Sequence, residues 1–457
     1  MGDLPRAASE GHYAKEQILC KDRLIYGSRR GRFPVALGSA RACGPGERAL
    51  DYGRGDGPSP AMLTGEPGEG VPRVAVVCDL REEGWHSMNL VADMLLEGLC
   101  AEHAGAVAAT RVCPPMRRRL SRAGAAAGPL FNADRLLNRF WDYPRHAGRL
   151  ARRFDLFHVV DHSYAQLVHR LPPRRTVVTC HDLDTFRCLL DPEGEPRPAA
   201  FRAMARRVLS GFRRAARVAC DSRATRDELL AHGLFAPENL AVIPNGVHPA
   251  FNVADDPAAG REAERLLGPA DAGAVELLHV GSTIPRKRVD VLLEVFARVR
   301  ARHPRARLVR VGGDFTAAQA ARAGRLGLGG AVVVLPHLDP RVLAAVYRRA
   351  ALVLLPSERE GFGLPVVEAL ACRAHVVASD LAVLREVGGG AATFCPVGDL
   401  DAWAATVLRL VGERGEGREA WAARLAAGPR HASRFTWRAY AAGVVELYRE
   451  VLCESAS

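Results

Sequence analysis

The first half of the chain alternates short apolar runs with segments of helical spacing. Apolar runs predict strands at residues 156–160, 176–180, 218–220 and 240–243, after a first strand that begins near Val71 and ends at Asp79. A helical pattern follows that first strand at 90–99. Alternating strands and helices predict a parallel sheet that is covered by helices on both faces.

The second half repeats this alternation. Strands are predicted at 275–280, 308–311, 331–335, 352–355 and 374–378. Helices are predicted at 289–300, at 340–350, from Pro365 onward, from a Ser379-Asp380 cap to about residue 387, and over 437–452. The fold class is therefore α/β, with two Rossmann-like domains.

Breaks in this pattern predict the domain boundaries. We expect a domain at 71–250, a linker at 251–272, a second domain at 273–435, and a final helix at 436–457 that could pack back on the first domain. Residues 1–70 are rich in glycine and proline and have no periodicity, so we expect a disordered extension. A start codon that is assigned too early is the equal alternative.

Composition narrows the class of protein. The 457 residues are 48% hydrophobic, which is enough for sizeable cores. No apolar run reaches the roughly 18–20 residues that span a bilayer, and the N-terminus lacks the apolar core of a signal peptide. The eleven cysteines include no C-x-x-C pair, which favours reduced thiols and a cytoplasmic location over disulfides or a zinc site.

The net charge of +12 comes almost entirely from arginine, and Lys287 is the only lysine after residue 21. Charge alone is weak support for nucleic-acid binding in such a chain. One segment, Arg111–Arg153, holds eleven arginines against Asp134 and Asp142. The aromatic residues interleaved with these arginines are Phe131, Phe140, Trp141 and Tyr143.

This segment has several interpretations. It could contact an anionic membrane at the inner face, or bind a phosphorylated acceptor. RNA binding would need a recognised RNA module, and none surrounds the segment, so no nucleic-acid partner is expected. The plain alternative is a solvated face with aromatic side chains in the core.

Three strand-to-helix turns in the second half carry candidate chemistry. The first presents Arg286 and Lys287, whose fork of donors and point charge suit a diphosphate. The second holds Gly312 and Gly313. The third places a Gly-Phe-Gly turn before a helix, between Glu360 and Glu368. A glycine loop at a helix N-terminus suits phosphate, and a carboxylate suits sugar hydroxyls. Ordinary connections with solvated charges remain the alternative.

His181 follows a predicted strand of the first domain. Polar groups at the carboxyl ends of parallel strands lie where ligands bind in open α/β sheets. The imidazole could donate to a sugar hydroxyl or a phosphate, or it could be purely structural.

Several motifs in this order resemble the family-4 (group 1) retaining glycosyltransferases of the GT-B fold. The second domain contributes VGSTIPRK at 280–287, VGGD at 311–314 and SEREGFGLPVVEALA at 357–371. The first domain contributes HD at 181–182, DSRATRDEL at 221–229 and PNGVHPAF at 244–251. Glu360 and Glu368 stand at the spacing of the family's E-x7-E motif. The resemblance covers residues 71–453.

The resemblance implies two domains that face each other across a cleft, and a role for each matching residue. Arg286 and Lys287 would bind the donor diphosphate, Glu360 the donor sugar, and Glu368 the ribose. His181 would lie near the transferred sugar, so the catalytic set is Glu360, Lys287, Arg286 and His181. The remaining donor-binding residues would be Gly281, Ser282, Gly312, Gly313, Gly361, Phe362, Gly363 and Leu364.

The implied activity is retaining transfer of a hexose-type sugar from a nucleotide sugar to a glycan, a lipid-linked acceptor or a small molecule, with no cofactor and no metal. A phosphorylase or epimerase, a non-catalytic sugar-nucleotide or glycan-binding protein, and an RNA-binding protein are the alternatives. Two positions depart from the pattern. Many relatives have Arg where this chain has Ser282, and the subgroup with a PRK run continues with Asn where this chain has Arg288.

Overall fold

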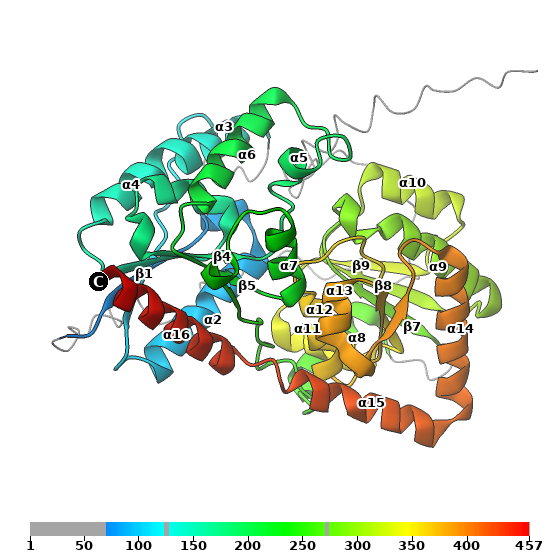
Figure 1. Cartoon of the computed structure of the whole chain (residues 1–457). Helices are drawn as coiled ribbons and strands as arrows, with labels where there is room; N and C mark the ends of the chain where they lie inside the picture. Colours follow the sequence, from blue (N-terminus) through cyan, green and yellow to red (C-terminus); the bar gives the residue numbers. More distant parts are fainter. Residues whose placement is uncertain (1–69, 123–127, 270–273, 457) are drawn as a thin grey trace, which may run out of the picture.

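The computed structural model describes residues 70–122, 128–269 and 274–456. These residues form two lobes, each built on a parallel sheet of six strands with helices on both faces (Figure 1). The strand orders are β2-β1-β3-β4-β5-β6 and β12-β11-β10-β7-β8-β9. This arrangement confirms the predicted α/β class.

The first lobe contains the strands β1 (Arg73–Val77), β2 (Ala108–Val112), β3 (Leu156–Val159), β4 (Thr176–Cys180), β5 (Arg217–Cys220) and β6 (Leu240–Val242). Its α-helices are α2 (His86–Glu102), α3 (Pro129–Leu137), α4 (Tyr143–Leu150), α5 (Arg187–Leu190), α6 (Ala199–Phe212) and α7 (Arg223–Ala231). Short helical turns are η2 (Arg81–Glu83), η4 (His162–His169), η5 (Pro173–Arg175) and η6 (Pro237–Asn239), and η3 (Asn138–Asp142) is a π-helix.

The second lobe contains β7 (Glu276–Val280), β8 (Arg307–Val311), β9 (Val332–Leu335), β10 (Leu352–Leu355), β11 (Val376–Ser379) and β12 (Thr393–Cys395). Its helices are α8 (Pro257–Leu267), α9 (Val289–Arg302), α10 (Ala317–Arg325), α11 (Pro340–Arg349), α12 (Leu364–Ala371), α13 (Ala382–Gly388), α14 (Leu400–Glu416) and α15 (Arg418–Ala432). Two short turns, η7 (Pro285–Lys287) and η8 (Gly389–Ala391), complete it.

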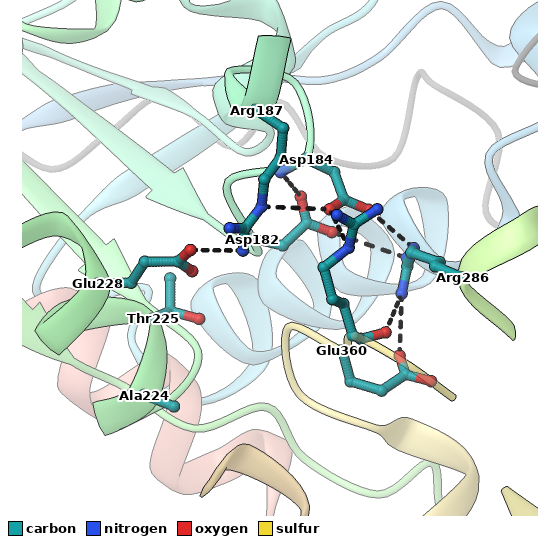
Figure 2. A pocket seen from close by; sticks show the side chains of 9 residues that line it. Asp182, Asp184, Arg187, Ala224, Thr225, Glu228, Arg286 and Glu360 are labelled. Carbon is teal, nitrogen blue, oxygen red and sulfur yellow. Dashed lines mark hydrogen bonds and ion pairs between the residues drawn. The ribbon is translucent and has the colours of Figure 1, made fainter. Parts of the chain in front are cut away.

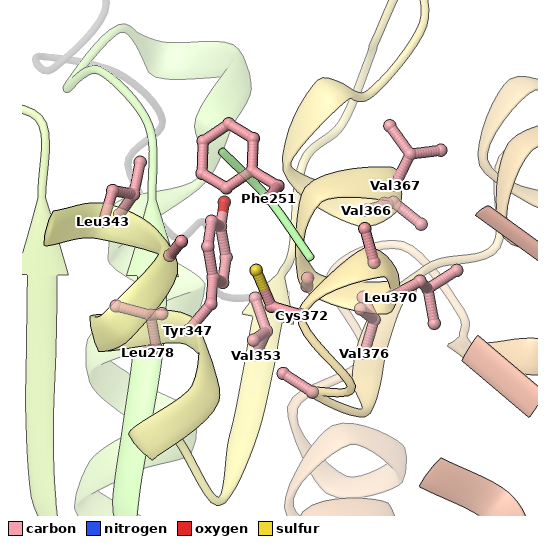
Figure 3. Packing of buried hydrophobic residues seen from close by; sticks show 14 of the residues in the cluster. Phe251, Leu278, Leu343, Tyr347, Val353, Val366, Val367, Leu370, Cys372 and Val376 are labelled. Atoms are coloured by element: carbon pink, nitrogen blue, oxygen red, sulfur yellow. The ribbon is translucent and has the colours of Figure 1, made fainter. Parts of the chain in front are cut away.

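Both faces of each sheet are buried, which is why the strands read as continuous apolar runs. On one face of the second sheet, α11 and α12 pack over β10 and β11, with Tyr347, Phe251 and Cys372 between them (Figure 3). The ring of Phe251 meets that of Tyr347 edge-on at 5.8 Å. The segment that leads into the second lobe therefore takes part in its core.

Two details differ from the sequence-based expectations. Residues 251–272 contain the helix α8, which Asp256 caps at the N-terminus and which packs against α11 through Ala259, Ala263 and Leu267. The predicted cap of α13 was wrong. Leu381 is the N-cap residue, and its apolar side chain makes no cap bond. The Asp380 carboxylate pairs with Arg385 instead.

The last helix, α16 (Trp437–Ala456), crosses back to the first lobe and packs against α2 (Figure 1). Tyr440, Val444 and Tyr448 enter the same core cluster as Val91 of α2. The Tyr448 hydroxyl lies 2.7 Å from Nδ1 of His158, a buried residue of β3. The final segment of the chain thus belongs to the first lobe. Among the described residues, no helix combines the length and apolar character needed to cross a bilayer.

Candidate functional site

Loops at the carboxyl ends of strands from both sheets meet between the lobes. They enclose a cavity of about 50 Å³, seen in Figure 2. Six of its lining residues come from the first lobe and three from the second. The lining residues are Asp182, Asp184, Arg187, Ala224, Thr225, Glu228, Arg286, Arg359 and Glu360.

Glu360 is the centre of a buried ionic cluster in the second lobe. Its carboxylate accepts hydrogen bonds from Lys287 Nζ at 2.6 Å, Arg286 Nη1 at 3.2 Å and Ser357 Oγ at 2.7 Å. Burial alone would raise the pKa of Glu360, but the charges of Lys287 and Arg286 lower it below its ordinary value. Glu360 is therefore an anion held between two cations.

Arg286 also contacts carboxylates of the first lobe. Its Nε lies 2.9 Å from Asp184 Oδ2, and its Nη2 lies 3.7 Å from Asp182 Oδ2. Arg359 of the second lobe adds ion pairs to Asp184 at 3.5 Å and to Glu195 at 2.8 Å. Figure 2 shows Asp182 and Asp184 of the first lobe next to Arg286 of the second. The Arg286 guanidinium, which the sequence assigns to a diphosphate, is thus paired with carboxylates in this structure.

Local backbone geometry explains how Arg286 and Lys287 reach this position. Pro285 starts the turn η7, and Arg288 then adopts a left-handed conformation with φ 47° before α9 begins. The carboxylate of Asp290 pairs with the Arg288 guanidinium at 3.0 Å. The backbone N–H of Glu358 donates to the carbonyl of Arg286 at 2.7 Å, which ties the two loops together.

Gly281 and Gly312 lie against each other in the structure. Gly312 has φ 124°, and a Cβ there would lie 2.2 Å from the carbonyl oxygen of Gly281. Gly313 follows with φ 96°. Only residues without side chains allow the turns after β7 and β8 to approach this closely.

Arg310 of β8 supports these glycine turns and was not singled out from the sequence. It is fully buried, and its Nη2 donates to the carbonyl of Gly281 at 3.0 Å, while Nη1 donates to that of Gly313. Burial lowers its pKa to about 10. The signal in the sequence is a charged residue inside an otherwise apolar strand just before a glycine pair.

His279 is the strand neighbour of Arg310 and lies beneath the first turn. The imidazole is fully buried, and neither ring nitrogen has a hydrogen-bond partner among the described residues. Burial, and next the charges of Arg310 and Lys287, lower its pKa to about 3. A neutral histidine therefore lies below the cationic pair.

The loop around Gly361 presses on the first lobe. A Cβ at Gly361 would lie 1.9 Å from the carbonyl oxygen of His181, so no other residue fits this contact. Ser222 Oγ donates to the Gly361 carbonyl at 3.0 Å. Next to it, Phe362 is buried against Phe435, and Gly363, with φ 92°, precedes α12, whose first residue is Leu364.

His181 meets this loop through its backbone, while its ring is occupied elsewhere. Nδ1 lies 2.6 Å from Asp221 Oδ2, and Nε2 lies 2.8 Å from the carbonyl of Val160. Burial would lower the pKa of His181, but the Asp221 carboxylate and its hydrogen bond raise it to about 9. Asn245 also donates to Asp221, at 2.9 Å. The structure gives this ring a bond to Asp221 and a bond to Val160, rather than a free nitrogen facing the cavity.

Glu368 lies apart from the ionic cluster, on α12. Its carboxylate accepts a hydrogen bond from the Tyr347 hydroxyl at 2.9 Å. Burial raises the pKa of Glu368 to about 7. The two glutamates of the motif therefore differ, since Glu360 is paired with cations and Glu368 with a neutral hydroxyl. Ser282, next to Gly281, is partly exposed.

Family models match both lobes. One described as Glycosyltransferase Family 4 matches residues 89–251, and one described as Glycosyl transferases group 1 matches residues 274–413. Each covers most of one lobe.

Characterised relatives agree with these matches. The D-inositol 3-phosphate glycosyltransferase of Kineococcus radiotolerans is 31% identical over 339 residues, which are 68% of this chain and 74% of that protein. Its namesake in Segniliparus rotundus is 35% identical over 231 residues, which are 47% of this chain and 48% of that protein. The Rhodococcus opacus protein of the same name is 32% identical over 60% of this chain and 61% of that protein. The match thus spans about half to three fifths of the latter two relatives.

Solved structures show the same architecture. Sucrose-phosphate synthase from Thermosynechococcus elongatus superposes with a TM-score of 0.65 at 21% identity, over 84% of this chain and all of that one. Anabaena HepE, solved in complex with UDP and glucose, superposes with a TM-score of 0.62 at 17% identity, over 83% of this chain and all of that one. At these identities the similarity establishes the two-lobed fold.

Proposed function

Because the chain belongs to the family-4 (group 1) glycosyltransferases of the GT-B fold, we propose that it is a retaining glycosyltransferase. It would move a hexose-type sugar from a nucleoside diphosphate sugar to a glycan, a lipid-linked acceptor or a small molecule. No metal or other cofactor enters the proposal, and within the described residues no cluster of His, Cys, Asp or Glu is arranged to hold a metal ion.

The observation that carries the proposal is the buried cluster of Lys287, Arg286 and Glu360 between the lobes. The two cations lie on one turn, Arg286 also reaches carboxylates of the first lobe, and Glu360 holds both cations at hydrogen-bond distance. Such a pair suits the two phosphates of a sugar nucleotide, since Arg offers a planar fork of donors and Lys a point charge. Most of the side chains that line the cavity are charged.

In this proposal the cationic pair stabilises the charge that develops on the departing nucleoside diphosphate. Preorganised charges in a water-poor site are usually the largest contribution to catalysis. Glu360 would keep the pair oriented and contact the sugar hydroxyls, and Glu368 would accept hydrogen bonds from the ribose. Asp221 maintains a positive charge on the His181 ring. In this proposal that charge lies behind the backbone of His181, which contacts Gly361.

A UDP-sugar is the first donor to examine, because HepE was solved with UDP and glucose. A GDP-sugar is the second. For the acceptor, D-inositol 3-phosphate belongs in the panel on the names of the relatives, together with simple glycans and lipid-linked sugars.

Release of nucleoside diphosphate across this panel tests the proposal. We expect turnover with one donor and one acceptor class, and a roughly 100- to 1,000-fold loss of kcat in Lys287→Ala and Glu360→Gln. Glu294→Gln, which removes a carboxylate of α9 that pairs with Arg322 of α10, is the matched control and should keep full activity.

The outcomes separate the alternatives. Full turnover in both Lys287→Ala and Glu360→Gln would overturn the residue roles. Saturable binding of a sugar nucleotide without turnover on the whole panel would indicate a binding protein on this fold. A sugar-release reaction that depends on inorganic phosphate would indicate a phosphorylase.

A further inference from the structure

Exposed apolar side chains gather on one part of the first lobe. Seven large apolar residues are exposed among the described residues, and five of them fall between residues 120 and 141. Scattered apolar residues are normal on a protein surface, whereas a cluster marks an interaction site. The five are Leu120, Leu130, Leu136, Leu137 and Trp141, and the two outside the cluster are Val253 and Val397.

Four of these side chains lie on the continuous helical segment α3–η3–α4. Its inner face buries Phe131, Asp134, Asn138, Tyr143 and Ala147. Leu130, Leu137 and Trp141 are seven and four residues apart, a spacing that keeps them on a common outer face. Arg145 follows four residues later, and its guanidinium lies 3.2 Å from the centre of the Trp141 ring. The exposed apolar side chains on this face are thus followed by the cation Arg145.

The apolar surface is held in place by buried polar contacts. The Asp134 carboxylate accepts hydrogen bonds from the backbone N–H groups of Arg119, Leu120 and Ser121, at 2.8 to 3.1 Å. Asn138 bonds to both the N–H and the carbonyl of Arg117, each at 2.7 Å. Leu120 is therefore presented beside the helix by a fixed backbone.

The charge on this surface is positive. Asp134 is buried, and Asp142 is committed to Arg119 through two hydrogen bonds of 2.7 and 2.8 Å. Across the described part of the chain, no carboxylate pairs with the arginines at the end of the segment. These are Arg145, Arg149, Arg152 and Arg153, all exposed.

We propose that this surface docks the protein on an anionic lipid bilayer. Leucine and tryptophan side chains would enter the interface, and the arginines beside them would meet lipid phosphates. Each cation near such a surface strengthens binding severalfold. A soluble phosphorylated ligand would use the arginines and leave the leucines in water, so the joint presence of both favours a membrane.

Flotation of the full chain with vesicles tests the proposal. We expect binding to vesicles with about one third phosphatidylglycerol at 0.1 M salt, much weaker binding at 0.5 M, and weak binding to phosphatidylcholine alone. Leu130→Ser/Leu137→Ser/Trp141→Ser and Arg145→Glu/Arg149→Glu should each weaken binding at least roughly tenfold. Thermal unfolding of each variant shows that it is folded.

The chain provides matched controls outside the surface. Val253→Ser/Val397→Ser removes the two other exposed apolar residues, and Arg302→Glu/Arg325→Glu reverses two exposed charges of the second lobe. Both controls should bind like the wild type. Absence of binding to anionic vesicles, or equal losses in variants and controls, would overturn the proposal. So would a wild-type dimer that the Leu/Trp variant converts to a monomer, since the surface would then join two copies.

Discussion

Glu368 shows how burial sets the behaviour of a single residue. Its pKa is raised to about 7, because the carboxylate is withdrawn from water and its one hydrogen bond comes from neutral Tyr347. The unfolded chain releases this proton near pH 4.5, so the folded state holds more protons between pH 4.5 and 7. Folding stability from this group therefore falls as the pH rises through that window.

This gives a prediction for nucleotide binding, which rests on the proposed ribose contact. An ionised Glu368 accepts two O–H donors and a protonated one accepts fewer, so binding at pH 6 should release a proton, roughly 0.5 to 0.9 per site. Titration calorimetry with UDP or GDP in two buffers of different ionisation enthalpy measures the release. Glu368→Gln should abolish it, while Glu294→Gln should keep it. Equal release in wild type and Glu368→Gln would contradict the assignment.

Arg288 illustrates a residue whose role depends on backbone conformation. The subgroup resembled by this chain usually has Asn here, and the position is left-handed with φ 47°. Asn tolerates that conformation better than other side chains that carry a Cβ. In this chain Asp290 and Glu358 instead surround the Arg288 guanidinium. The left-handed φ gives a physical reason for Asn at this position.

Among the elements, the glycine turns after β7 and β8 make the sharpest prediction. Gly312→Ala would place a methyl group 2.2 Å from the Gly281 carbonyl at a left-handed φ, so one turn must move. We expect a loss of about 1–3 kcal/mol in the free energy of unfolding, and weaker nucleotide binding.

Denaturant unfolding and calorimetry measure the two effects. Gly324→Ala is the control, since that glycine lies within α10 and a Cβ there meets nothing within 4 Å. It should be neutral or stabilising by up to about 1 kcal/mol. Unchanged stability and nucleotide affinity in Gly312→Ala would show that the turns are less closely packed than described.

The elements also show how far the sequence alone leads. Long apolar runs located ten of the twelve strands, because both faces of each sheet are buried and leave no polar alternation to confuse the pattern. The edge strands β2 and β12 were not predicted, because most of their residues are partly exposed and include Thr and, in β2, also Arg. Helix α8 escaped because Asp256 and Pro257, which start it, were interpreted as loop residues. Local sequence patterns therefore do not distinguish these two strands and this helix from loops.

For the candidate site, motif spacing brought together Arg286, Lys287 and Glu360, which the structure places in contact. Contacts between the lobes could not be predicted, because they join residues that lie roughly 100 to 175 positions apart. Asp184, Arg359 and Glu195 form ion pairs that no local pattern encodes. Arg310 was accessible in principle, as a charge inside a buried strand.

At the scale of the whole molecule, the lobes are closed on each other by charge. The cavity of about 50 Å³ is far smaller than the roughly 300–1,000 Å³ of typical ligand sites, so a sugar nucleotide requires the lobes to separate. Arg286 holds Asp184 at 2.9 Å, and a diphosphate would compete for the same guanidinium. If the chain binds a nucleoside diphosphate as proposed, opening would exchange these carboxylates for phosphates.

Asp184→Asn tests this exchange. Removing the competing charge should tighten binding of a nucleoside diphosphate by roughly three- to tenfold and reduce its dependence on salt. Asp227→Asn, on an exposed pair with Arg226 of α7, is the control and should change neither. Calorimetry at two salt concentrations gives both values. Weaker binding in Asp184→Asn would mean that this carboxylate supports the donor rather than competing with it.

The packing of α16 on α2 has a consequence for how the protein is made. The second lobe lies wholly between the two segments of the first, so it leaves the ribosome complete before residues 437–456 do. Until then α2 exposes the apolar face that Tyr440, Val444 and Tyr448 later cover. Although its sheet is synthesised first, the first lobe is the last to finish folding, and chaperones have longest access to that face.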